Sequence, residues 1–227
     1  MAKRVDFSDE TAVLKEMAKA LEVKWNDLSI REASNYEGFG TGTVYEINQS
    51  FSRSEWYVVE NEDQAEALAI EIVKQDLESE PEIFNQDFIE RHIDEKKLRD
   101  ELMPDVRNFA QEDLEALSTE DFWEAYEGEG LDAPEEDEEG NRREPISREI
   151  EELAERQAEE RLRDPMEYLE DIYGKIDAVK EAIRIAGIDE DEAAKEAVNA
   201  DGAGHFLSSY DGETHETPAG LVYWRHN

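Results

Sequence analysis

The chain has 227 residues, is 38% hydrophobic and 38% charged, and contains four Trp, eight Tyr and eight Phe, an aromatic content that argues against a wholly disordered chain. It contains no Cys, which excludes disulfides and thiolate metal sites, and its first ten residues contain no apolar leader. The formal net charge is −38, and no window approaches the roughly 18 apolar residues of a membrane span, so we expect a soluble, cytoplasmic protein without membrane contacts.

The first part of the chain, residues 1–127, is predicted to combine helices with two strands. Apolar residues recur at helical spacing over 8–21, behind Ser8 as the N-cap, and again over 62–78. Between these helices, β-branched and aromatic residues favour an antiparallel pair of strands over 44–47 and 55–60. Shorter helices are expected over 85–93, 95–102, 105–117 and 119–127, with Pro81 and Pro104 as breaks.

The second part of the chain, residues 146–227, follows an acidic segment at 128–145. That segment mixes Gly, Pro and charge without periodicity, so we expect an exposed linker that is the most mobile internal segment. Helices are expected over 146–163, from Pro165 to Gly187 without a break, and over 189–200. A strand at 221–225 could join the early pair, and the predicted fold is therefore α+β, mostly helical, with a small antiparallel sheet of about three strands that includes the C-terminal one.

The negative charge can be compared with that of DNA. The accessible surface expected for a folded protein of this mass gives roughly 280 Å² of surface per net negative charge, whereas duplex DNA has about 110 Å² of surface per charge. The two densities become similar only if the acids cluster. Residues 112–140 hold fourteen carboxylates and no Lys or Arg, since the nearest cations are Arg107 and Arg142.

Within this run, residues 119–127 are predicted to form a two-faced helix. Phe122, Trp123 and Tyr126 follow i, i+1, i+4, which favours a packing face. Glu120, Glu124 and Glu127 follow i, i+4, i+7 on the other face, which brings neighbouring Cβ atoms to about 5–6 Å. A merely solvated face explains the same stripe equally well.

The sequence gives no specific catalytic, cofactor or metal motif. Carboxylate pairs are too common here to indicate a glycosidase, and the four His lack metal-ligand spacing. The phosphate-binding glycine loops and the nucleophile elbow are absent. We therefore expect no enzyme, no cofactor and no metal; an enzyme centred on His205, Tyr210 and Asp211 remains an alternative of last resort.

The segment DGAGHFLSSYDGE, followed by the terminal LVYWRHN, resembles the C-terminal end of small acidic proteins that tailed bacteriophages encode. The resemblance covers about the last thirty residues and, weakly, the strands with EDQAEALAIEIVKQDLE. It implies a viral or mobile-element origin, hence a host cytoplasm, and brings no catalytic residues. The charge is similar to that of DNA mimics that block restriction or other defence nucleases, although no motif of such a family is present.

These observations predict an inhibitor that occupies the basic DNA- or RNA-binding groove of a host defence protein and does not itself bind nucleic acid. Two alternatives stay open: an acidic surface that only serves solubility or high-salt adaptation, and a virion or assembly component whose helices between 146 and 183 form an oligomer interface, a homodimer included. The expected contact residues are Glu112, Asp113, Glu120, Asp121, Glu124, Glu127, Asp132, Glu135, Glu136, Asp137, Glu138 and Glu139.

Overall fold

The computed structural model describes residues 5–36, 38–50, 52, 54–135, 137 and 141–226. The chain divides into two compact units, of which unit 1 comprises Met1–Ile83 and Asp189–Asn227, and unit 2 comprises Phe84–Ile188. Both boundaries lie outside the segment 128–145, which we expected to divide the chain and which falls within unit 2.

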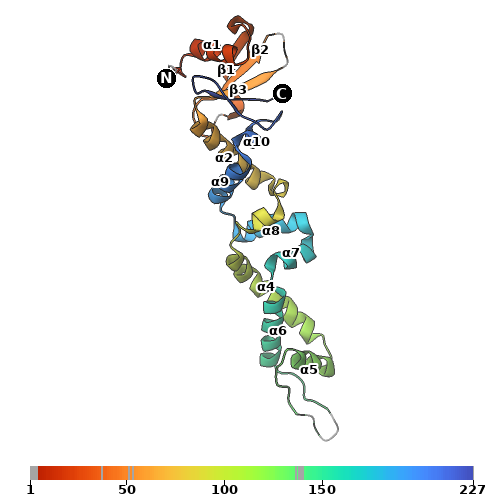
Figure 1. Cartoon of the computed structure of the whole chain (residues 1–227). Helices are drawn as coiled ribbons and strands as arrows, with labels where there is room; N and C mark the ends of the chain where they lie inside the picture. Colours follow the sequence, from red (N-terminus) through yellow and green to blue (C-terminus); the bar gives the residue numbers. More distant parts are fainter. Residues whose placement is uncertain are drawn as a thin grey trace. The chain divides into compact units, whose positions relative to one another are not determined.

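Unit 1 is built on one antiparallel sheet with the strand order β1-β2-β3-β5-β4 (Figure 1). The fold is α+β and mostly helical, as expected. β5 pairs with β3, with Trp56 opposite Arg225 and Val59 opposite Val222, so the predicted return of the C-terminal strand to the early strands is confirmed. The five strands among the described residues are β1 (Leu28–Glu32), β2 (Tyr45–Gln49), β3 (Glu55–Val59), β4 (His215–Glu216) and β5 (Val222–Arg225).

Two of these strands, β1 and β4, were not predicted. β1 pairs along its whole length with β2, and Ile30 lies opposite Ile47. Its sequence, LSIRE, contains only two apolar residues, which is a weak signal, although they alternate with polar ones. β4 has two residues, too few for any periodicity, and exists because β5 is beside it.

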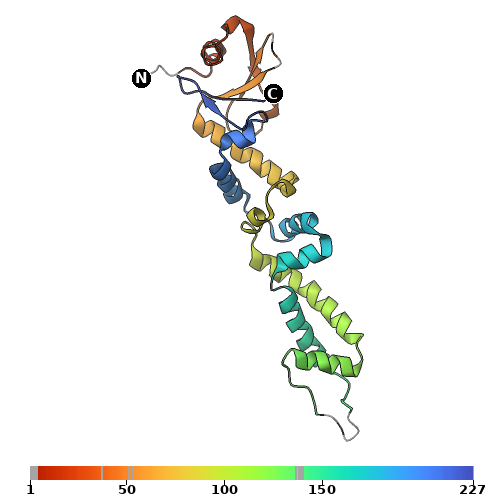
Figure 2. The same cartoon turned by 45° about the vertical axis from the view of Figure 1, so that its right-hand side comes forward.

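The helices of unit 1 cover this sheet and extend from it. α1 (Glu10–Ala20) packs Val13 and Met17 against Ile47 and Val58. α2 (Glu62–Ser79) lies beside α9 (Glu190–Asp201), as both views show, and α10 (Ala203–Leu207) contacts both (Figures 1 and 2). In the part of the unit that the structure describes there are also three short 3-10 helices: η1 (Trp25–Asp27), η2 (Ser34–Tyr36) and η3 (Pro81–Ile83).

The N-cap of α1 is Asp9 and not Ser8. The Asp9 carboxylate accepts from the backbone N–H groups of Thr11 and Ala12, at 3.0 and 3.2 Å. The Ser8 hydroxyl donates instead to Asp6, at 2.7 Å. Both residue types cap helices well, so composition alone does not distinguish two adjacent candidates.

Unit 2 is helical. α4 (Glu95–Glu115) lies alongside α6 (Ser147–Arg161), as Figure 2 shows, and α5 (Thr119–Gly128) closes the end of this pair. α3 (Gln86–Glu90), α7 (Pro165–Tyr173) and α8 (Lys175–Ala186) complete the unit. Arg99 of α4 donates to the carbonyls of Leu162 and Arg163, at 2.9 and 3.0 Å, and so satisfies acceptors that the end of α6 leaves free.

The predicted break at Pro104 is wrong, because α4 runs through it. An interior Pro removes a hydrogen bond and costs roughly 3 kcal/mol. However, the buried residues Leu98, Val106, Ala110 and Leu114 continue one apolar face across the Pro, and packing of its second half against α6 offsets the cost.

The unbroken helix from Pro165 to Gly187 is also wrong. It is split at Gly174, whose φ of 77° and ψ of 162° lie outside every helical region. The apolar period of the sequence continues through the break, so periodicity could not reveal it. As a result Ile172 and Ile176, which an unbroken helix would place on one face with the buried Leu169 and Val179, are exposed.

Candidate acidic surface

The acidic surface is built on α5, and its buried face holds that helix in place. Phe122, Trp123 and Tyr126 are buried, and they pack against Leu153 and Ala154 of α6 and the second half of α4. The interpretation of the aromatic group as a packing face is therefore confirmed. The Tyr126 hydroxyl donates to Glu152 at 3.1 Å, and burial, together with this acidic acceptor, raises the pKa of Tyr126.

The start of α5 is stabilised by its own polar residues. The backbone N–H of Asp121 donates to the Ser118 hydroxyl at 3.2 Å, and that hydroxyl donates to the Asp121 carboxylate at 2.6 Å. Glu120 and Asp121 lie in the first turn, where the helix dipole favours negative charge. The chain can thus concentrate carboxylates here at a lower cost than in the middle of a helix.

All nine of the described contact residues that the sequence predicted are exposed. They follow one another from the end of α4, through α5, into the segment after it, and they are Glu112, Asp113, Glu120, Asp121, Glu124, Glu127, Asp132, Glu135 and Asp137. The other three, Glu136, Glu138 and Glu139, lie outside the described residues. In the described part of 129–146 there is no helix or strand; the predicted mobility of this segment stays a prediction.

The stripe of Glu120, Glu124 and Glu127 borders a shallow cavity of about 360 Å³. Arg142 lies in the wall of the same cavity and pairs with Glu127 at 2.9 Å. The run of residues 112–140, free of cations in sequence, therefore has a cation beside it in space. The remaining lining residues are Thr119, Trp123 and Asn141.

Further basic side chains reach this region from α6 and the segment before it. Arg161 lies 3.6 Å from Asp113, and Arg156 donates to the carbonyl of Glu129 at 2.8 Å. Arg143 stacks over the Trp123 ring, 5.3 Å from its centre, and pairs with Glu149, whose pKa the Arg143 hydrogen bond lowers. These contacts leave Glu112, Glu120 and Glu124 without an ion pair among the described residues.

Negative charge is not confined to unit 2. Its sequence holds 34 Asp and Glu against 14 Lys and Arg, a net charge of −20. Unit 1 holds the other 28 acids and 10 bases, a net charge of −18. What distinguishes the α5 region is therefore the local run of acids and not the charge of the whole unit.

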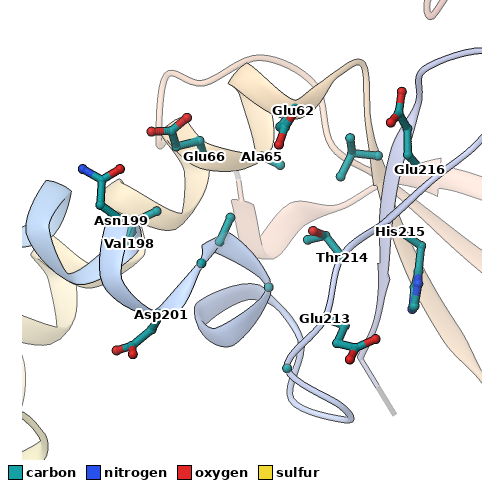
Figure 3. A pocket seen from close by; sticks show the side chains of 15 residues that line it. Glu62, Ala65, Glu66, Val198, Asn199, Asp201, Glu213, Thr214, His215 and Glu216 are labelled. Carbon is teal, nitrogen blue, oxygen red and sulfur yellow. The ribbon is translucent and has the colours of Figure 1, made fainter.

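A second acidic feature is a cavity of about 580 Å³ in unit 1 (Figure 3). Figure 3 shows Glu62 and Glu66 on α2, Asn199 and Asp201 at the end of α9, and the segment Glu213 to Glu216 across from them. None of its described lining residues is a Lys or Arg, but the carboxylates of Glu66, Asp201 and Glu216 lie apart and do not converge on one point (Figure 3). Sequence reasoning missed this cavity, because its walls come from segments more than a hundred residues apart.

The described residues contain no group of three or more His, Asp and Glu side chains that could hold a metal ion. Among these residues no helix combines the length and the apolarity needed to cross a membrane.

The contacts around Asp211 do not form a hydrolase triad. The Ser208 hydroxyl bonds the Asp211 carboxylate at 2.7 Å and the carbonyl of Arg225 at 2.8 Å, instead of an imidazole. Asp211 lies 3.7 Å from His215, so the carboxylate stands between hydroxyl and imidazole, whereas a triad needs the imidazole in the middle. Ser209 lies 3.3 Å from Nδ1 of His226 and also donates to the carbonyl of that residue.

Of the three residues in the enzyme alternative, two have other partners. His205 packs edge-on against Phe206, and Tyr210 stacks on the Arg225 guanidinium, 3.7 Å from the ring centre.

Comparisons with protein-family models, with curated proteins and with solved structures give no match to this chain.

Proposed function

We propose that this protein is an acidic inhibitor that binds in the basic nucleic-acid-binding groove of another protein and excludes nucleic acid from it. The proposed target is a nuclease or another nucleoprotein complex of host defence. The observation that carries the proposal is that all nine described carboxylates of the predicted contact set are exposed along one run of chain, on and beside a packed helix.

The packing of α5 supports a mimic with fixed charge positions. Helical geometry sets carboxylates three or four residues apart at about 5–6 Å between Cβ atoms, and the buried aromatic face keeps α5 from rotating. A groove that neutralises phosphates releases their counterions, and fixed carboxylates can occupy the same cationic sites. The segment after α5 adds charge that would steer the encounter.

Arg142 lowers the local charge at one end of the stripe, so the strongest contacts are expected elsewhere on it. Glu120 and Glu124 have no ion pair among the described residues, whereas Glu127 must exchange Arg142 for a cation of the target. The first two should therefore contribute more to binding than the third.

The experiment has two steps. Proteins captured from a bacterial lysate on the immobilised full chain identify the target. Displacement of fluorescent duplex DNA from that target is then measured with the wild type and with a variant in which Glu120, Glu124 and Glu127 are all changed to Lys. Displacement should weaken in the variant and also as salt rises, because charge pairs at an exposed surface are screened over about 8 Å at physiological ionic strength.

A matched control changes Glu32, Glu60 and Glu78 to Lys. These residues are exposed and lie in unit 1, and both triple variants alter the net charge from −38 to −32. Equal loss of displacement in the two variants would contradict a specific surface and leave only general acidity. Indifference to salt and to both variants would overturn the proposal.

The alternative in which acidity serves high-salt adaptation makes a different prediction. Mutual repulsion would then make the free energy of unfolding small in low salt and much larger near 1 M, where screening acts over about 3 Å. Stability that is already high in low salt would argue against it.

A further inference from the structure

The corner between α7 and α8 exposes three large apolar side chains. Ile172 and Tyr173 end α7, Gly174 turns the chain, and Ile176 lies in the first turn of α8. Their exposed fractions are 52%, 50% and 62%, which makes this the densest group of exposed large apolar residues along the described chain. We call these three residues the apolar corner.

The apolar corner is not needed for packing within the unit. α7 buries Met166 and Leu169, and α8 buries Ala178, Val179, Ala182 and Ala186 on its other side. Because Gly174 interrupts the helix, the corner turns away from these buried faces. Clustered apolar side chains left in water are typical of a surface that another molecule covers.

The charges around the apolar corner differ from those of the remaining chain. α8 contains Lys175, Lys180 and Arg184 against Asp177 and Glu181, a net charge of +1. Every other helix that the structure describes sums to zero or to a negative value. α7, which carries Ile172 and Tyr173, sums to −3, so the two helices together carry −2 and form a surface of mixed charge in an otherwise strongly acidic chain.

The corner also carries both signs of charge. Asp171 precedes it and Lys175 lies within it, and both side chains are exposed. Across a two-fold axis, Asp171 of one copy can lie opposite Lys175 of the other, and the same contact is then made twice. The surface is thus complementary to itself, whereas an acidic partner would meet Asp171 and a basic partner would meet Lys175.

We propose that two copies of this chain associate through the apolar corner. The inference goes beyond the proposed inhibitor function and does not depend on it, because the corner and the α5 stripe share no residue. Three apolar side chains per copy make a small interface of the weak, concentration-dependent class.

The salt dependence separates this contact from the inhibitor surface. Salt screens the repulsion between two chains of charge −38 and leaves apolar burial in place, so association should strengthen as salt rises. Binding of the acidic stripe to a basic groove should weaken over the same range. Failure of one proposal therefore leaves the other testable.

The experiment is sedimentation equilibrium of the full chain at about 10 to 500 µM, in about 0.05 to 0.5 M NaCl. A dimer should form as concentration and salt rise. The double variant Ile172→Asp with Ile176→Asp should lower the association constant at least about ten-fold, because it places like charges in a contact without water. A matched control, Ile83→Asp with Phe109→Asp, changes two residues that are 58% and 57% exposed elsewhere, and it should leave association unchanged apart from the small effect of two added charges.

A charge exchange tests the proposed pairing independently of the apolar residues. Lys175→Glu should weaken association, and adding Asp171→Lys to the same chain should restore it. Both residues are exposed, so both variants should fold, which far-UV circular dichroism checks. A wild-type chain that stays monomeric at the highest concentration and salt overturns the proposal, as does equal loss of association in the apolar-corner and control variants.

Discussion

Gly204 in α10 should tolerate no side chain, and the structure gives the size of the effect. A Cβ built on Gly204 would lie 2.6 Å from the carbonyl oxygen of Gly212 and 2.7 Å from the backbone of Glu213 and of Thr214. All three atoms are main chain, so no side chain can rotate away, and either α10 or the segment 212–214 must move. Overpacking of this kind costs typically 1–3 kcal/mol, and for Gly204→Ala we expect the upper half of that range, a fall in Tm of roughly 10 °C.

The assay is urea unfolding followed by tryptophan fluorescence, which in unit 1 reports on Trp25, Trp56 and Trp224. The control is Gly128→Ala at the end of α5, where nothing lies within 4 Å of the built Cβ and φ is not positive. This second variant should be neutral or stabilising by about 0.4–1 kcal/mol, because Ala restricts the unfolded chain more than Gly does. A Gly204→Ala protein as stable as the wild type would refute the close approach of α10 to the segment 212–214, and with it the shape of the cavity in Figure 3.

Three further changes test other parts of the fold. Glu46 is 4% exposed, and burial alone would raise its pKa. Hydrogen bonds from Arg31 and Asn48, together with the positive charge of Arg31, outweigh the effect of burial, so the pKa of Glu46 is lowered. The pKa of Glu46 in the folded state therefore lies below the unfolded value of about 4.3, so the stabilisation by the ion pair is complete above that value and is lost as pH falls through the folded pKa. Glu46→Gln should lower the free energy of unfolding by about 1–3 kcal/mol at pH 7 and by less in acid. If urea unfolding shows a loss that does not change with pH, the ion pair of Glu46 with Arg31 is contradicted. Pro104→Ala should stabilise unit 2 by roughly 1–3 kcal/mol, since Ala restores an interior helix hydrogen bond, and thermal unfolding with an unchanged or lower Tm would indicate that α4 needs its Pro. Gly174→Ala should lower the free energy of unfolding by about 1–3 kcal/mol, because a φ of 77° strains the backbone of any residue with a Cβ. Nothing lies within 4 Å of the built Cβ, so no clash adds to this strain. An unchanged Tm in thermal unfolding would show that the backbone at this corner relaxes.

What could be predicted from the sequence was local. The spacing of Val13 and Met17 in α1 and the aromatic face of Phe122, Trp123 and Tyr126 depend on residues within two turns of each other. Helix formation is decided over that distance, so periodicity suffices to place the helices, although residue type did not distinguish Asp9 from Ser8 as the cap of α1. The exposure of the acids in α5 follows from the same reasoning, because the opposite face is aromatic.

The tertiary structure decided whatever depends on partners distant in the chain. The two residues of β4 are a strand only because β5 lies beside them, and Arg142 reaches Glu127 only because the chain folds back after α5. At Gly174 a single residue with positive φ interrupts the helix and leaves Ile172 and Ile176 exposed, without altering the apolar period of the sequence. The sequence by itself therefore determined which helix faces are apolar and where acids concentrate. Long-range contacts decided which cations meet those acids, and one backbone conformation decided which apolar residues stay exposed. Neither the long-range contacts nor the conformation of Gly174 leaves a periodic signal in the sequence.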